Sequence, residues 1–102
     1  MSIESFAKKL GYKICYTNVK SSHVNHTLKC IFTFQNNCSI QHFQLSHELG
    51  HCVIYRITKN AKKSFLNELM AWIIGLYVCF RCKIKSKGFF KEATKCLKTY
   101  IK

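Results

Sequence analysis

The amino-acid sequence predicts an α+β fold in which a short antiparallel sheet is followed by three helices. Apolar residues recur at steps of three and four along residues 39–55, along 64–82 and near the C-terminus, as on the buried faces of helices. Residues 12–18 and 28–35 are rich in β-branched and aromatic side chains, which is typical of strands. The 102 residues contain no proline and no long Gly/Ser stretch, so they predict one domain over residues 1–102.

The N-terminal third is expected to form a short helix and then two strands. Ser2 is a natural N-cap for the helix, and Gly11 is a natural stop after it. The polar residues 20–26 are expected to form a loop between the two predicted strands. Asn36 and Asn37 then end the second strand.

Three helices are expected after the sheet. The first has Ser39 as a suitable N-cap and runs to about Tyr55, and a basic loop over 56–63 separates it from a helix that runs from near Ser64 to about Cys82. One face of the second helix carries a carboxylate and small residues, which would let it lie close to the first: Glu68, Ala71, Gly75 and Cys79. The last helix is amphipathic, with an apolar face formed by Phe90, Ala93, Leu97, Tyr100 and Ile101.

The pattern His47-Glu48-Leu49-Gly50-His51 is the feature that points to a chemistry. On a helix, the two histidines lie one turn apart on the same face and can both reach one Zn²⁺. Glu48 then lies at the edge of the site, where it can activate water. Gly50 is unfavourable inside a helix. We expect it to mark the close approach of another element, and the alternative is a tolerated glycine.

A catalytic zinc site needs a third protein ligand and leaves one position for water. Glu68 is the only acidic residue between His51 and Glu92, so it is the candidate. The alternative is that Glu68 only favours the helix N-terminus electrostatically. Glu48 is the expected general base, which takes a proton from the attacking water. The sequence does not identify the oxyanion-stabilising residue: Tyr55, His42 and His26 are candidates, and the alternative for each is a structural role.

The segment SIQHFQLS before HELGH, residues 39–46, and the segment NELMA, residues 67–71, are similar to those of ImmA/IrrE-type metallopeptidases. These are gluzincin-like HExxH zinc enzymes that are common in phages and mobile elements. The resemblance covers about residues 1–80 and implies a small zincin-like domain with His47, His51 and Glu68 as zinc ligands. Trp72 departs from it, because gluzincins often carry an acid at that position.

The net charge of +13 is the second unusual feature. The chain has no Asp, and seventeen Lys and Arg outnumber four Glu. Such a surface favours acidic partners, either nucleic acid or an acidic protein. The alternative is a solubilising surface with no partner of its own.

The seven cysteines are expected to be reduced thiols in a cytoplasmic protein, since the N-terminus lacks the pattern of a signal peptide. The alternative is a secreted disulfide-bonded fold. Cys79 and Cys82 form a single CxxC, for which buried thiols are expected rather than a second metal site. The apolar run 69–80 is too short to cross a bilayer, so no membrane association is expected.

The sequence therefore predicts a small zinc-dependent metalloendopeptidase that acts on a protein or peptide, for example a host or regulatory protein. One alternative is a non-catalytic protein of the same fold that binds nucleic acid or an acidic host protein. Another is a latent peptidase whose C-terminal helix covers its own cleft. The oligomeric state is not predicted.

Overall fold

The computed structural model describes residues 2–34, 39–59, 64–85 and 87–100 and confirms the α+β class. Its elements, in chain order, are α1 (Ile3–Lys9), β1 (Lys13–Tyr16), β2 (His23–Asn25), β3 (Cys30–Thr33), α2 (Ser39–Thr58), α3 (Phe65–Arg81), α4 (Phe89–Leu97) and a 3₁₀ turn, η1 (Lys98–Tyr100). In the described part of the chain, no helix is long and apolar enough to cross a membrane.

The sheet is mixed, with the strand order β1-β3-β2. β2 runs antiparallel to β3, whereas β1 runs parallel to it, so the prediction of a wholly antiparallel sheet is wrong. Residues 20–26 are also not all loop, because His23–Asn25 forms the edge strand β2. Three residues are too few for a period-two pattern to stand out in the sequence. The extra strand reverses the chain once more, and β1 and β3 therefore point the same way.

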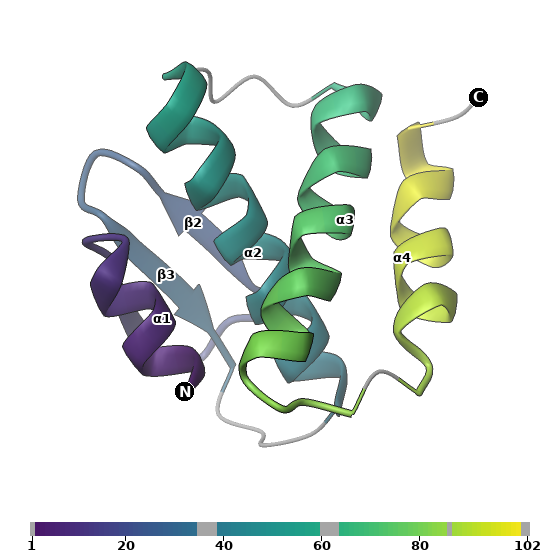
Figure 1. Ribbon diagram of the computed structural model, residues 1–102, viewed down its shortest axis with the longest axis horizontal. Coiled ribbons are helices and arrows are strands. Elements are labelled where there is room, and N and C mark those ends of the chain that lie inside the picture. The colour runs from purple at the N-terminus through teal and green to yellow at the C-terminus, as the bar shows by residue number, and fades with distance from the viewer. Residues whose placement is uncertain (1, 35–38, 60–63, 86, 101–102) are drawn as a thin grey trace.

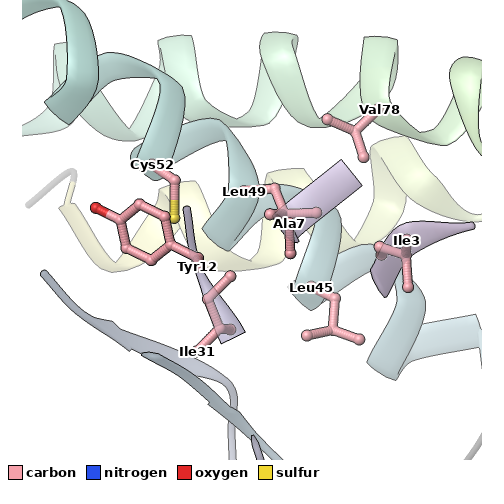
Figure 2. Packing of buried hydrophobic residues seen from close by; sticks show 8 residues of the cluster. All are labelled: Ile3, Ala7, Tyr12, Ile31, Leu45, Leu49, Cys52 and Val78. Atoms are coloured by element: carbon pink, nitrogen blue, oxygen red, sulfur yellow. The ribbon is translucent and has the colours of Figure 1, made fainter. Parts of the chain in front are cut away.

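The helices lie beside the sheet in successive layers (Figure 1). α2 lies between the sheet and α3, and α4 lies on the other side of α3. One core cluster joins α1, the sheet, α2 and α3 (Figure 2); it contains Ile3, Ala7, Tyr12, Ile31, Leu45, Leu49, Cys52 and Val78. A second cluster joins α2, α3 and α4; it contains Phe43, Trp72, Cys79, Phe89 and Ala93. α2 is thus packed on two sides, which fixes the motif that it carries.

The predicted helices are confirmed, with shifts at their ends. Ser2 caps α1 through its side chain, and Gly11 follows with a φ of +85°. α2 continues to Thr58, so part of the expected basic loop is helical, and residues 60–63 lie outside the described residues. Asn36 and Asn37 lie outside them as well.

The predicted apolar face of α4 is wrong at Phe90. Phe89 is buried in the second core cluster, whereas Phe90 is 67% exposed. The helix begins at Phe89, so its inward face starts one residue earlier than expected. Ile101 lies outside the described residues. Because Phe89 and Ala93 belong to the core, α4 is an integral part of the fold.

Candidate metal centre

α2 places the two motif histidines on one face, one turn apart. The ring centroids of His47 and His51 lie 4.6 Å apart. Their side chains are only 12% and 14% exposed, respectively. Each ring turns its Nε2 atom toward α3, so the two nitrogen atoms converge on one point rather than diverging into solvent.

That point is the carboxylate of Glu68, in the first turn of α3. The Oε2 atom of Glu68 lies 2.7 Å from Nε2 of His47 and 2.8 Å from Nε2 of His51. Ser64 caps α3, since its hydroxyl accepts a hydrogen bond from the backbone N–H of Asn67. The cap fixes the start of the helix one turn before Glu68. The structure therefore brings together the three residues that the sequence predicts as ligands.

Two glycines allow α2 and α3 to approach this closely. A Cβ atom added to Gly50 would lie 2.2 Å from the carbonyl oxygen of Ala71, and one added to Gly75 would lie 3.1 Å from the backbone of Ser46 and His47. The predicted close approach at Gly50 is therefore confirmed. It occurs between the two histidines, so it sets the distance from their rings to Glu68.

Glu48 is the second carboxylate beside His47. Its Oε2 atom lies 3.1 Å from Nδ1 of His47, the ring nitrogen that Glu68 does not contact. His47, Glu48 and His51 offer ligand atoms that all lie within 4.8 Å of one another, so they could hold a metal ion. Glu68 contacts both Nε2 atoms, whereas Glu48 contacts Nδ1. Ligating histidines commonly bind through one nitrogen and donate from the other to a carboxylate, and Glu68 at Nε2 with Glu48 at Nδ1 would fit such an arrangement.

The two carboxylates also control the protonation of His47. Burial alone would lower the pKa of His47, but hydrogen bonds and charge interactions with Glu48 and Glu68 outweigh it and raise the pKa to about 9. Without a metal ion, His47 is therefore protonated at neutral pH.

Trp72 stands one turn after Glu68 and contacts His47 through its ring. The two rings are stacked, with a centroid distance of 4.2 Å and an interplanar angle of 8°. Trp72 in turn meets the edge of Phe89 from α4. The resemblance predicts an acid at position 72. Trp72 instead orients His47 by stacking, and Glu48 accepts the hydrogen bond from Nδ1.

A cleft of about 380 Å³ opens over these residues. Its walls are formed by Ser22, His23 and Val24 on the sheet side and by Trp72, Cys96 and Thr99 on the side of α3 and the C-terminus. Gln44 of α2 also lines it and accepts a hydrogen bond from the backbone N–H of Ser22. The sequence did not reveal the wall formed by β2. Within the described residues, the C-terminal part of the chain contributes Cys96 and Thr99 to the lining of the cleft.

Of the three candidates for an oxyanion-stabilising residue, only His26 is among the residues that line this cleft. Its Nδ1 lies 2.8 Å from the hydroxyl oxygen of Tyr12, and its ring is stacked on Tyr55 at 4.2 Å. Tyr55 therefore positions His26 rather than facing the cleft. Among the described residues, Nε2 of His26 makes no hydrogen bond, and burial together with His51 lowers the pKa of His26.

The six cysteines in the described part of the chain are free thiols. Cys79 of the CxxC pair is buried and donates to the hydroxyl of Ser46, whereas Cys82 is half-buried. In the CxxC pair, the expected burial therefore holds for Cys79 but not for Cys82. Cys38 lies outside them.

Comparison with known proteins adds no relative. No protein-family model, no curated protein and no solved structure matches this chain. The resemblance to ImmA/IrrE-type metallopeptidases therefore stays a prediction. A function can therefore be proposed only from the geometry and chemistry of the site.

Proposed function

We propose that this protein is a zinc-dependent metallopeptidase that binds Zn²⁺ through His47, His51 and Glu68. The observation that carries the proposal is the position of Glu68 Oε2, at 2.7 and 2.8 Å from the two histidine Nε2 atoms. A carboxylate that is 4% exposed is costly to bury without a cationic partner. Two imidazoles and one carboxylate are also a usual ligand set for catalytic zinc.

The fit to zinc depends on the donor set. Imidazole nitrogen suits zinc, whereas Mg²⁺ and Ca²⁺ prefer oxygen ligands throughout. When bound, zinc supplies a Lewis acid that makes water more acidic and polarises a carbonyl group. The remaining chemistry belongs to residues of the chain.

Glu48 is the general base in this proposal. It is 8% exposed, lines the cleft and is held beside His47, so it lies next to the ligands without occupying the position of Glu68. It takes the proton from the attacking water and passes it to the leaving amine.

His26 is the proposed donor to the oxyanion that forms on the substrate carbonyl. Burial raises the pKa of Tyr12 to about 12, so its hydroxyl keeps its proton, and this proposal has it donate to Nδ1 of His26. The ring proton of neutral His26 then resides on Nε2, the nitrogen that has no partner within the described residues. Such a fixed donor stabilises negative charge that develops in the transition state.

The edge strand β2 provides a place for an extended peptide. His23 and Val24 line the cleft, and β2 pairs with β3 along one side within the described residues. An extended substrate can add to such an edge through main-chain hydrogen bonds. A protein or peptide substrate therefore fits the cleft.

Metal analysis of the purified protein tests the ligand set. We expect one zinc per chain in the wild type and a loss of at least about tenfold in affinity for Glu68→Gln. Glu92→Gln is the matched control, because Glu92 is also a buried glutamate but lies on α4 outside the cleft lining. Equal zinc affinity of Glu68→Gln and the wild type would contradict the proposal.

Peptide cleavage tests the catalytic roles. Zinc-loaded Glu48→Gln should keep its metal and lose turnover by more than about a hundredfold, because it lacks the base. His26→Ala should lower kcat with little change in zinc content. Cleavage that survives in Glu48→Gln would exclude this site as its source.

A second candidate function is the binding of nucleic acid, and a cationic hollow separate from the cleft favours it. The hollow has a volume of about 330 Å³, and its lining contains no acidic residue among the described ones. Five cations line it: Lys8, Lys9, Lys29, Arg56 and Lys59. Clustered cations of this kind bind phosphate groups.

Affinity for a mixed-sequence oligonucleotide, measured over a range of salt concentrations, tests this second function. Lys8→Glu should weaken binding. It should also reduce the slope of log K against log salt concentration by roughly one to two. Lys91→Glu is the control, because it makes the same change in net charge on an exposed helical site outside the hollow. Equal effects of the two substitutions would dismiss the hollow as the binding site.

A further inference from the structure

An exposed apolar stripe runs along α3, on the face opposite the metal centre. It consists of five large side chains at alternating steps of four and three: Leu66 (65% exposed), Met70 (43%), Ile73 (55%), Tyr77 (54%) and Phe80 (80%). The inward face of the same helix carries Glu68, Ala71 and Gly75, all buried. This alternation is the spacing of a coiled-coil seam, where one helix packs along another.

The stripe also lacks the charge that covers the rest of the molecule. α3 contains only two charged residues, Glu68, which is buried, and Arg81, which is in its last turn. Elsewhere the chain carries sixteen further Lys and Arg. An uncharged, apolar strip does not contribute to solubility, so its presence on so cationic a surface needs another explanation. Contiguous exposed apolar patches of a few hundred Å² often mark interaction sites.

The exposed area is enough for a small specific interface. At roughly 150–200 Å² for a large apolar side chain, the exposed fractions of the five residues amount to about 550 Å² per chain. Two copies would thus bury at most about 1,100 Å² from these side chains. Specific interfaces begin at about 1,000–1,200 Å² in total.

We propose that this stripe is the interface of a homodimer in which the α3 helices of two copies pack antiparallel. The stripe is symmetric about Ile73, which lies four and seven residues from Tyr77 and Phe80 and three and seven residues from Met70 and Leu66. In an antiparallel pair, Ile73 meets Ile73, Met70 meets Tyr77, and Leu66 meets Phe80. Such self-complementarity is what a two-fold interface requires.

This arrangement keeps both metal centres open. Glu68 and Trp72 line the cleft from the inward side of α3, whereas the stripe lies on the outward side. α4 packs on α3 through Trp72 and Cys79, so it does not cover the stripe within the described residues. The dimer is therefore independent of zinc binding and of the proposed peptidase function.

Sedimentation equilibrium of the full chain tests the proposal. The wild type should reach twice the chain mass of 11.9 kDa. Added salt should tighten the dimer, because it screens the repulsion between two chains of charge +13. Ile73→Lys should weaken dimerisation more than about a hundredfold, since it would bury two facing charges.

Ile57→Lys is the matched control, because Ile57 is 77% exposed on α2, away from the stripe. It should leave the dimer intact. Both substitutions are at exposed positions, and circular dichroism checks that each variant is folded. A wild type that stays monomeric at every concentration, or a dimer that Ile73→Lys leaves unchanged, would overturn the proposal.

Cysteine cross-linking tests the antiparallel register. Under mild oxidation, Ile73→Cys should form a covalent dimer beyond the level of the wild type, because the two residues meet at the axis. Leu66→Cys should not form one alone, but should do so when mixed with Phe80→Cys. Cross-linking of Leu66→Cys with itself would contradict this register. A monomer that binds anionic vesicles through the stripe would overturn the dimer in favour of a membrane surface.

Discussion

The substitution Gly50→Ala tests the link between helix packing and the metal site. The added Cβ atom would lie 2.2 Å from the carbonyl oxygen of Ala71. An ordinary contact between carbon and oxygen is about 3.3 Å or longer, so α3 must move away from α2 by roughly 1 Å. The obstacle is backbone, which no side-chain rotation can relieve.

Two effects of opposite sign determine the change in stability. Alanine favours the helix over glycine by about 1 kcal/mol. Overpacking of this kind typically costs about 1–3 kcal/mol and occasionally more. Because 2.2 Å is far inside the contact distance, we expect the upper end of that range, and a net loss of about 1–2 kcal/mol in the free energy of unfolding. Moving α3 also withdraws Glu68 from both imidazoles, so zinc affinity should fall by at least about tenfold.

Urea unfolding of the metal-free protein and a zinc competition titration measure the two effects. Gly75→Ala is the matched control, because its Cβ would meet the backbone of α2 at 3.1 Å and needs a shift of only a few tenths of an ångström. It should stay within about 1 kcal/mol of the wild type. If Gly50→Ala were as stable as Gly75→Ala and bound zinc as tightly as the wild type, glycine packing would not set the ligand geometry.

Three further predictions concern titration and spectroscopy at the site. In the folded protein, the pKa of His47 is raised from its ordinary value of 6.5 to about 9. Its contribution to the stability of the metal-free protein should therefore be full below pH 6.5 and lost as the pH rises through about 9. The difference in unfolding free energy between the wild type and His47→Gln should shrink over that window. Trp72 is the single tryptophan and is stacked on His47, so zinc binding should change its fluorescence in the wild type but not in His47→Gln, and an unchanged emission in both would argue against the site. Burial and then Glu92 raise the pKa of Cys96 to about 11, so its alkylation at pH 8, followed by mass spectrometry, should be slow and should speed up in Glu92→Gln; a rate that Glu92→Gln does not change would show that the carboxylate is unimportant.

The local features of this fold could be predicted because neighbours in the sequence determine them. Ser2 and Ser64 cap helices by reaching backbone groups three residues away. His47 and His51 share a face because of the helical repeat. Gly50 signals a close approach because a buried helix has little other reason to carry glycine. Each of these depends on contacts within one or two turns of the chain.

The sheet could not be predicted to the same extent, because its pairing depends on residues far apart in sequence. β2 is too short to show a pattern, and the hairpin that it forms with β3 makes β1 and β3 parallel. The same strand builds one wall of the cleft and leads to His26. Neither the wall nor the role of Tyr12 and Tyr55 in holding that ring was visible in the sequence.

The sequence by itself determined which residues the helices present: two histidines one turn apart, and a glutamate on a face of small side chains. Only the tertiary structure decided that Glu68 reaches both Nε2 atoms, that Trp72 stacks on His47, and that Phe89 rather than Phe90 enters the core. The physical reason is the range of the interactions. Helical periodicity acts over a few residues, whereas the approach of α2 to α3 depends on how closely two backbones can pack.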